Sequence, residues 1–398
     1  MALKTKIKLG SSALSFVFFY CSFCLAAHAQ PHVEAKFGKG LKVTAADSSF
    51  SLKISPRFQT MYEGNLNLNN DDWEEKFIIR RARIKLEGFA FDPSLEYKIE
   101  LAFSNRDIGR GIPQTNNAGN ILLEALVKWN FHRNLELWAG QTKLPGNRER
   151  VISSQNLQFV DRSILNSYFT LDRDIGIQLR NKFNIQSAVF NQAVSIATGE
   201  GKNITTNNAG GRNYTFRLEA LPFGEFKDKG DYIGADLARE ETPRLAIGVS
   251  YDLNKQASRE NGQSGSFLEA KRDLHTLFID GMFKYKGSSL MFEYALKTAT
   301  HGPVVALENG TVLQSFATGN GLNLQAGYLF KNNVELSARY SQVTPDEETQ
   351  RNNEEEYTLG LSKYISGHNL KVQGDISMVQ EQGLDDQLRF RLQLEIGL

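Results

Sequence analysis

Apolar and polar residues alternate along many short stretches of the chain, and residues 387–398 show the most regular alternation. Every second residue from Leu388 to Leu398 is apolar, and the residues between them are polar or glycine. A period of two places successive side chains on opposite faces of a β-strand. The stretch has about the 9–11 residues that a tilted strand needs to cross a bilayer. We therefore expect a strand with one face toward lipid and the other toward an aqueous lumen.

Sixteen stretches of this kind can be counted: 50–62, 77–90, 95–104, 121–131, 135–142, 174–181, 183–196, 213–221, 244–253, 274–285, 289–298, 322–330, 334–343, 357–365, 370–378 and 387–398. The links after even-numbered stretches contain only a few residues, except for 222–243, whereas those after odd-numbered stretches are mostly long and polar. Short turns at one end, long loops at the other and an even strand number are typical of outer-membrane barrels. The pattern predicts a 16-stranded antiparallel transmembrane β-barrel over residues 49–398, with both chain ends on the periplasmic side.

The first 29 residues have a different pattern. Three lysines within the first eight residues precede an apolar run, and Ala-His-Ala at 27–29 provides small residues around a cleavage position. This arrangement predicts a secretory signal peptide over residues 1–29; an N-terminal membrane-spanning helix is the alternative. Both cysteines lie in this segment, so the exported chain is expected to form no disulfide. Residues 30–48 show little alternation and are expected to form a periplasmic segment before the barrel.

Composition and net charge limit which kinds of protein and which binding partners are compatible with the sequence. The mean hydropathy is negative, which is compatible with a barrel because lumen-facing polar residues dilute the apolar ones. Removing the three lysines of the predicted signal peptide from the 46 basic residues leaves 43, against 45 acidic residues. This near balance gives no indication of a nucleic-acid partner. A soluble β-protein is an alternative that composition alone leaves open.

Basic residues gather on the polar face of three strands that barrel closure brings side by side. Closure pairs the last strand with the first, and the first strand pairs with the second. The seven cations on this face are Lys53, Arg57, Arg81, Arg83, Lys85, Arg389 and Arg391. Such a wall in a narrow pore lowers the barrier for anions; a mixed lumen that only orders water is the alternative. Ile79 and Arg80 break the alternation, which indicates a β-bulge.

The longest link lies after the fifth strand, at 143–173. Its cations are interspersed with acidic residues and include Lys143, Arg148, Arg150 and Arg162. A loop of this length inside a barrel usually has a function. We expect it to fold inward and narrow the pore, and an outward surface loop is the alternative.

Five segments resemble those of the phosphate-selective porin O/P family, in the same order along the chain. They are RRARIKLEG at 80–88, GQTKLP at 140–145, RDIG at 173–176, VELSARY at 334–340 and GHNLK at 367–371. The resemblance implies a sixteen-stranded barrel, usually trimeric, with the third outer loop folded into the lumen and basic side chains that pass anions. Matched by position, the family's basic residues fall on Lys143, Arg148 and Arg150 in the loop and on Arg81, Arg83 and Lys85 on the wall. Their charge-assisted hydrogen bonds suit phosphate oxygens.

These observations favour a passive porin in the outer membrane of a Gram-negative bacterium. Its expected partners are membrane lipid, small hydrophilic or anionic solutes and further copies of itself in a homotrimer, without a cofactor. A barrel that acts in surface binding or adhesion is the alternative. An enzyme is not expected, because the five histidines outside residues 1–29 lack metal-binding spacing and no G-x-S-x-G or H-E-x-x-H motif occurs.

Overall fold

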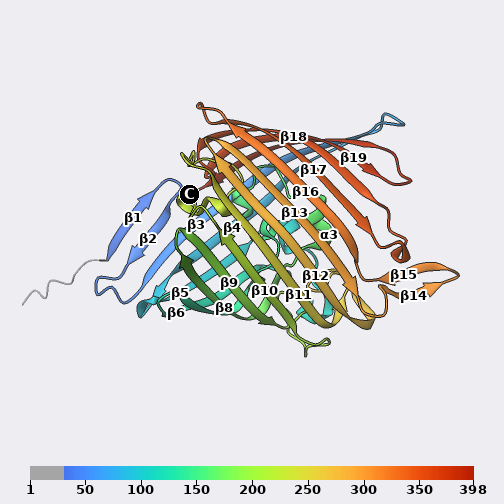
Figure 1. The fold of residues 1–398 in the computed structure, drawn as a ribbon, viewed down its shortest axis with the longest axis horizontal. Coiled ribbons are helices and arrows are strands. Elements are labelled where there is room, and N and C mark those ends of the chain that lie inside the picture. Colours follow the sequence, from blue (N-terminus) through green and yellow to red (C-terminus); the bar gives the residue numbers. More distant parts are fainter. Residues whose placement is uncertain (1–30) are drawn as a thin grey trace, which may run out of the picture.

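Sixteen antiparallel strands form a closed barrel in the computed structural model, which describes residues 31–398 (Figure 1). The strands are β3 (Ser51–Asn67), β4 (Trp73–Ala90), β5 (Asp92–Ala102), β6 (Leu122–His132), β7 (Leu135–Lys143), β8 (Arg173–Ile185), β9 (Ala188–Ala197), β10 (Asn213–Leu221), β11 (Arg244–Arg259), β12 (Phe267–Tyr285), β13 (Ser288–Ala299), β16 (Gly319–Leu329), β17 (Val334–Pro345), β18 (Glu354–Ser366), β19 (Leu370–Glu381) and β20 (Gln387–Gly397). Closure occurs where β20 pairs with β3, from Gln387 opposite Asn67 to Gly397 opposite Arg57. The predicted strand number and pairing order are confirmed. The predicted signal peptide lies outside the described residues.

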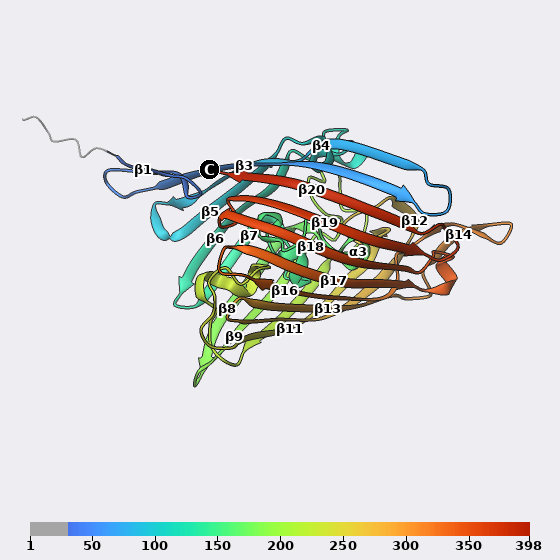
Figure 2. The same ribbon diagram turned by 90° about the horizontal axis from the view of Figure 1, so that it is seen from above.

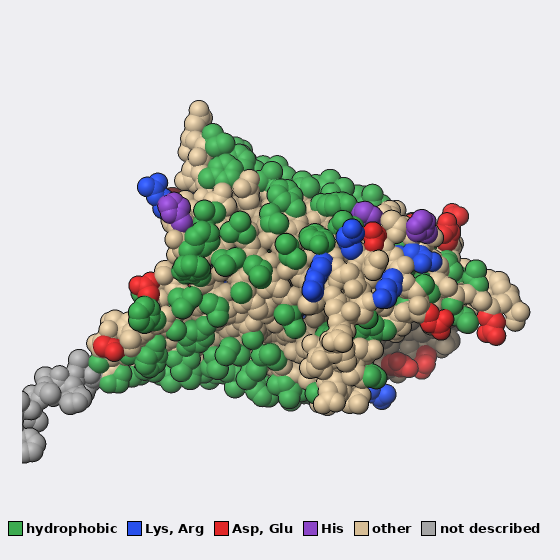
Figure 3. Space-filling model, turned by 90° about the horizontal axis from the view of Figure 1, so that it is seen from below, with side chains coloured by type: hydrophobic (Ala, Val, Ile, Leu, Met, Phe, Trp, Pro, Cys, Tyr) green, Lys and Arg blue, Asp and Glu red, His purple; other side chains and the backbone are tan. Residues whose placement is uncertain are grey.

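The barrel has an apolar outer wall and a polar interior. On β20, Leu392 is 54% exposed, whereas Arg391, Gln393 and Glu395 are buried. On the face that Figure 3 shows, hydrophobic side chains cover much of the outer surface of the strands. Apolar side chains that remain exposed in this regular alternation are suited to contact with lipid.

A β-bulge in β4 explains the break in alternation that the sequence shows. Arg81 lies opposite Gln59 and Ile79 lies opposite Thr60, so Arg80 is an additional residue in β4. The bulge turns Ile79 outward and Arg80 into the barrel, where the arginine is buried. The predicted shift in register is therefore present, and Arg80 joins the lumen cations.

A small hairpin precedes the barrel, in a region where the sequence analysis expected no strand. It consists of β1 (His32–Lys36) and β2 (Gly40–Thr44), and β2 pairs with the first residues of β3. Because β20 ends opposite Arg57, this part of β3 has a free edge for β2. The hairpin lies beside the C-terminus, so both described chain ends are at the same end of the barrel (Figure 1).

The connecting segments contain only short helices. These are α1 (Asn105–Ile108), η1 (Pro113–Thr115), α2 (Arg148–Val151), η2 (Ser154–Asn156), α3 (Ile164–Phe169), η3 (Lys227–Tyr232) and η4 (Glu347–Thr349). A separate hairpin, β14 (Val304–Glu308) with β15 (Thr311–Ser315), projects from the end that carries the long loops (Figure 2). Within residues 31–398 we find no helix with the length and apolar character needed to cross a membrane.

Candidate permeation pathway and its charged lining

The segment between β7 and β8, residues 144–172, lies inside the barrel, and we call it the inner loop. Leu165 and Phe169 of α3 are fully buried in one apolar cluster with Phe278 of β12 and Val343 of β17. Burying large apolar side chains stabilises this position by about 1.5–3 kcal/mol for each side chain. The inner loop therefore packs on the β12–β17 side of the wall and leaves space on the opposite side.

Arg148 anchors the inner loop and does not line the open space. Its side chain is fully buried, forms an ion pair with Glu219, and donates from Nε to Asp280 Oδ1 at 2.7 Å. The guanidinium also donates to the carbonyl oxygen of Asp231 at 2.8 Å and stacks over the Tyr232 ring. The prediction that Arg148 binds anions in the pore is therefore wrong, because two buried carboxylates already occupy its donors.

A cavity of about 730 Å³ lies between the inner loop and the wall formed by β3–β8 and β20. Its thirteen basic residues are Arg80, Arg81, Arg83, Lys98, Arg106, Lys143, Arg150, Arg162, Arg173, Arg180, Lys202, Arg389 and Arg391. Its seven acidic residues are Glu63, Glu100, Asp107, Glu124, Asp161, Asp172 and Glu356. The lining is thus strongly charged and has an excess of positive charge.

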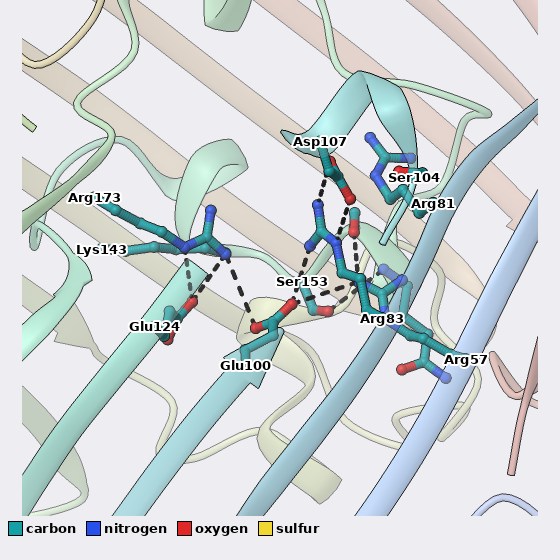
Figure 4. Close-up of polar contacts among 12 residues, drawn as sticks. Arg57, Arg81, Arg83, Glu100, Ser104, Asp107, Glu124, Lys143, Ser153 and Arg173 are labelled. Atoms are coloured by element: carbon teal, nitrogen blue, oxygen red, sulfur yellow. Dashed lines mark hydrogen bonds and ion pairs between the residues drawn. The ribbon is translucent and has the colours of Figure 1, made fainter. Parts of the chain in front are cut away.

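The cations predicted on β3 and β4 do come together, but they are paired with acids (Figure 4). Arg57 lies opposite Arg83 in the register of the two strands. Arg83 donates to Asp107 at 2.7 Å and to Glu100 at 3.0 Å, and Arg57 forms an ion pair with Glu395 at 3.2 Å. These carboxylates neutralise the two like charges and hold both guanidinium groups in fixed positions.

The remaining cations predicted on this wall also have carboxylate partners. Arg81 pairs with Asp161 at 3.0 Å, Arg389 with Glu356 at 3.2 Å and Arg391 with Asp375 at 2.6 Å. Lys53 and Lys85 each lie 3.1 Å from Glu87. These two lysines lie outside the lining of the 730 Å³ cavity, and Lys53 instead lines a smaller cavity beside the β1–β2 hairpin.

Comparison with known proteins identifies the family. The sequence model of the phosphate-selective porin O and P family matches residues 53–385. The chain belongs to this family of porins. No curated protein matches the chain in sequence.

Solved outer-membrane structures share the fold of this porin at low sequence identity. The anion-selective porin from Comamonas acidovorans has a TM-score of 0.56 and 12% identity, over 88% of this chain and 100% of that one. OmpT from Vibrio cholerae in its trimer form has a TM-score of 0.53 and 11% identity, over 88% and 100%. OmpF from Salmonella typhi, in complex with daunomycin, has a TM-score of 0.54 and 10% identity, over 88% and 99%. At these identities the likeness establishes a shared barrel architecture.

Several lining cations of this porin have no carboxylate within ion-pair distance among residues 31–398. Lys143 donates instead to the backbone carbonyls of Val151 and Ile152, at 3.0 and 3.3 Å. Arg162 donates to the backbone carbonyls of Glu149 and Ile152, at 3.0 and 2.7 Å. The others in this group are Arg106, Arg180 and Lys202. Carbonyl oxygens orient Lys143 and Arg162 without neutralising their charge. The positive field of the lining therefore comes mainly from the cations that have no carboxylate partner.

The surroundings of Arg162 show how positive this face of the inner loop is. Burial, together with the nearby Arg150 and Arg81, holds the pKa of Arg162 well below its ordinary value. Arg150 contributes less to the field, because it forms an ion pair with Asp172. An anion placed beside Arg162 would relieve this repulsion between like charges.

Sequence reasoning missed part of this lining. Arg173 and Lys98, both of which pair with Glu124, were not proposed as site residues. The alternation of Glu96, Lys98 and Glu100 along one strand was the available signal. Within residues 31–398 no group of three or more His, Cys, Asp or Glu side chains is placed to hold a metal ion.

Proposed function

We propose that this outer-membrane porin favours small anions and conducts them passively through the cavity beside the inner loop. The observation that carries the proposal is the lining, in which thirteen basic residues face seven acidic ones in a space of about 730 Å³. Positive charge along a narrow, partly enclosed path concentrates anions and lowers their entry barrier. Diffusion along the solute gradient needs neither a cofactor nor an energy source.

Lys143 and Arg162 are the residues we propose as the main contacts of a passing anion. Both lie on the cavity, and neither has a carboxylate partner among the described residues. Their N–H groups suit the oxygens of phosphate-like anions, because charge-assisted hydrogen bonds replace part of the lost hydration. The acids that line the same space keep binding weak, so that an anion leaves as readily as it enters.

We also propose that the porin assembles as a homotrimer in contact with lipid. The support is indirect: a solved porin of the same architecture, OmpT from Vibrio cholerae, is described in a trimer form. The exposed apolar side chains on the outside of the strands provide the surface for lipid and for neighbouring copies (Figure 3).

Reversal potential in a planar bilayer with a potassium chloride gradient tests the anion preference. We expect stepwise channel currents and a reversal potential that reports chloride as the more permeant ion. The double variant Lys143→Gln with Arg162→Gln should move the reversal potential toward zero. A cation-selective wild-type channel would overturn the anion proposal, and a folded barrel without stepwise current would overturn conduction itself.

A further inference from the structure

A second segment also enters the barrel, from the end opposite the long loops. It is the 222–243 link between β10 and β11, which contains η3 (Lys227–Tyr232). Other turns at this end are short, as at Lys286 and Gly287 between β12 and β13. Phe226, Ala235 and Asp236 of the link are buried. A long link that buries its middle residues has a structural or functional task beyond joining two neighbouring strands.

The 222–243 link is in direct contact with the inner loop. Its Gly234 N–H donates to the carbonyl oxygen of Asn156 at 2.8 Å. Arg148 of the inner loop donates to the carbonyl oxygen of Asp231 and stacks over Tyr232. Ile152 and Leu157 of the inner loop share one buried apolar cluster with Phe226, against which Tyr232 packs. The two segments therefore support each other inside the lumen.

The link is equally well attached to the barrel. Lys284 of β12 donates to the carbonyl oxygen of Ala235 at 2.7 Å, and the Gly287 N–H donates to Asp236 at 2.7 Å. Arg239 donates to the carbonyl oxygen of Leu329 at 2.8 Å, near the turn between β16 and β17. These contacts tie the link to two separate turns of the wall, so it has a fixed position beneath the inner loop.

The open cavity and the 222–243 link occupy different halves of the lumen. The cavity is lined from β3–β8, β18, β20, the inner loop and neighbouring outer-loop residues, and no residue of the link, all of which the structure describes, contributes to it. On the β10–β17 side, the link and the inner loop share one apolar cluster with the strands, and the inner loop alone forms a second one with them. The 730 Å³ cavity thus lies on one side of the barrel interior, and the packed segments lie on the other.

We propose that the 222–243 link is an internal strut that keeps this side of the barrel closed and holds the inner loop in position. It makes the route beside Lys143 and Arg162 the single path across the barrel, so the link sets selectivity without touching the solute. The inference rests on the proposed function, because a single route matters only if the barrel conducts. It also accounts for the burial of Arg148 at the junction of inner loop, link and wall.

Replacing the link by a short turn tests the strut. Ala220 of β10 pairs with Ile247 of β11, which places Leu221 opposite Ala246. An Asn-Gly turn can therefore join Leu221 to Ala246 in place of residues 222–245 without a change of register. We expect conductance to rise by about twofold or more and the reversal potential to move toward zero, because ions would also pass beside the inner loop. Shortening the β14–β15 hairpin, which projects outside the barrel, is the matched control and should change neither quantity.

A point substitution keeps the test decisive if the shortened barrel does not fold. A Cβ on Gly234 would lie 2.6 Å from the backbone nitrogen of Gln158, so Gly234→Val pushes the link away from the inner loop. Gly374→Val is the control, because a Cβ there meets its nearest atom at 3.5 Å. We expect Gly234→Val alone to give noisier, larger and less selective currents, with heat-modifiable gel migration confirming a folded barrel.

The outcomes separate the strut from the porin proposal. If wild-type protein conducts anions and Gly234→Val matches it in conductance, current noise and reversal potential, the strut is refuted and the anion pore stands. If the folded wild-type barrel carries no stepwise current, the proposed function itself fails.

Discussion

Arg148 offers the sharpest test of how the inner loop is held. Its guanidinium is fully buried between Glu219 and Asp280, 2.7 Å from the latter. Replacing it by methionine keeps much of the side-chain volume but removes the charge. Both carboxylates then lose a partner in a site from which water is largely excluded.

The expected loss of stability follows from the partners that would remain. Removing one member of a buried ion pair typically costs about 3–5 kcal/mol. Arg217 also reaches Asp280 at 2.7 Å and Glu219 at 3.2 Å, so it compensates part of the charge. We therefore expect Arg148→Met to lower the free energy of unfolding by about 3 kcal/mol, the lower end of that range.

Urea unfolding of the porin in lipid vesicles, followed by tryptophan fluorescence, measures this loss. Arg110→Met is the control, since Arg110 is exposed and has no ion pair among residues 31–398, and it should change the free energy by less than about 0.5 kcal/mol. A loss below about 1 kcal/mol for Arg148→Met would show that the buried ion pairs do not hold the inner loop. Arg148→Lys should recover only part of the stability, because an ammonium group cannot donate in two fixed directions.

Three further predictions concern conduction. Arg162→Gln should shift the reversal potential in a potassium chloride gradient in the direction of greater potassium permeability. Lys255→Gln, at an exposed position, should leave the reversal potential unchanged. Asp161→Asn removes the carboxylate that pairs with Arg80 and Arg81, so it should increase the anion preference in the same measurement while lowering the urea midpoint. Raising the salt from 0.1 to 1 M shortens the screening length from about 10 to about 3 Å, so anion selectivity should fall in a bilayer titration with salt; a constant selectivity would indicate that pore size, not charge, selects the solute.

Local periodicity was sufficient to predict the barrel. The alternation from Leu388 to Leu398 is a property of neighbouring residues, and lipid and water on the two faces of the wall impose it on every strand. The same information revealed the bulge at Arg80, because one additional residue reverses the parity. The hairpin of β1 and β2 was missed, since every residue of β1 is exposed and the burial along β2 does not alternate, so neither strand shows a period of two.

The charge pattern of the lumen could not be predicted to the same degree. Arg148 pairs with residues that lie 71 and 132 positions further along the chain, and nothing local distinguishes it from Arg162. A cation's charge is neutralised only if the closed barrel places a carboxylate next to it, and that carboxylate can lie far away in the sequence. Sequence reasoning located the basic strands but could not separate the cations that carboxylates neutralise from those that we propose as contacts of a solute.

This separation explains why the anion path that we propose contains so many acids. A lining of thirteen unpaired cations in one small space would repel itself and bind an anion too tightly to release it. Pairing Arg83 with Glu100 and Asp107, and Arg81 with Asp161, removes most of that repulsion and fixes the wall. Lys143 and Arg162, held only by carbonyl oxygens, then present a limited positive charge at defined positions. A channel needs to attract the solute at entry and to bind it weakly during passage. A small number of uncompensated cations on a rigid, otherwise neutralised wall meets both requirements.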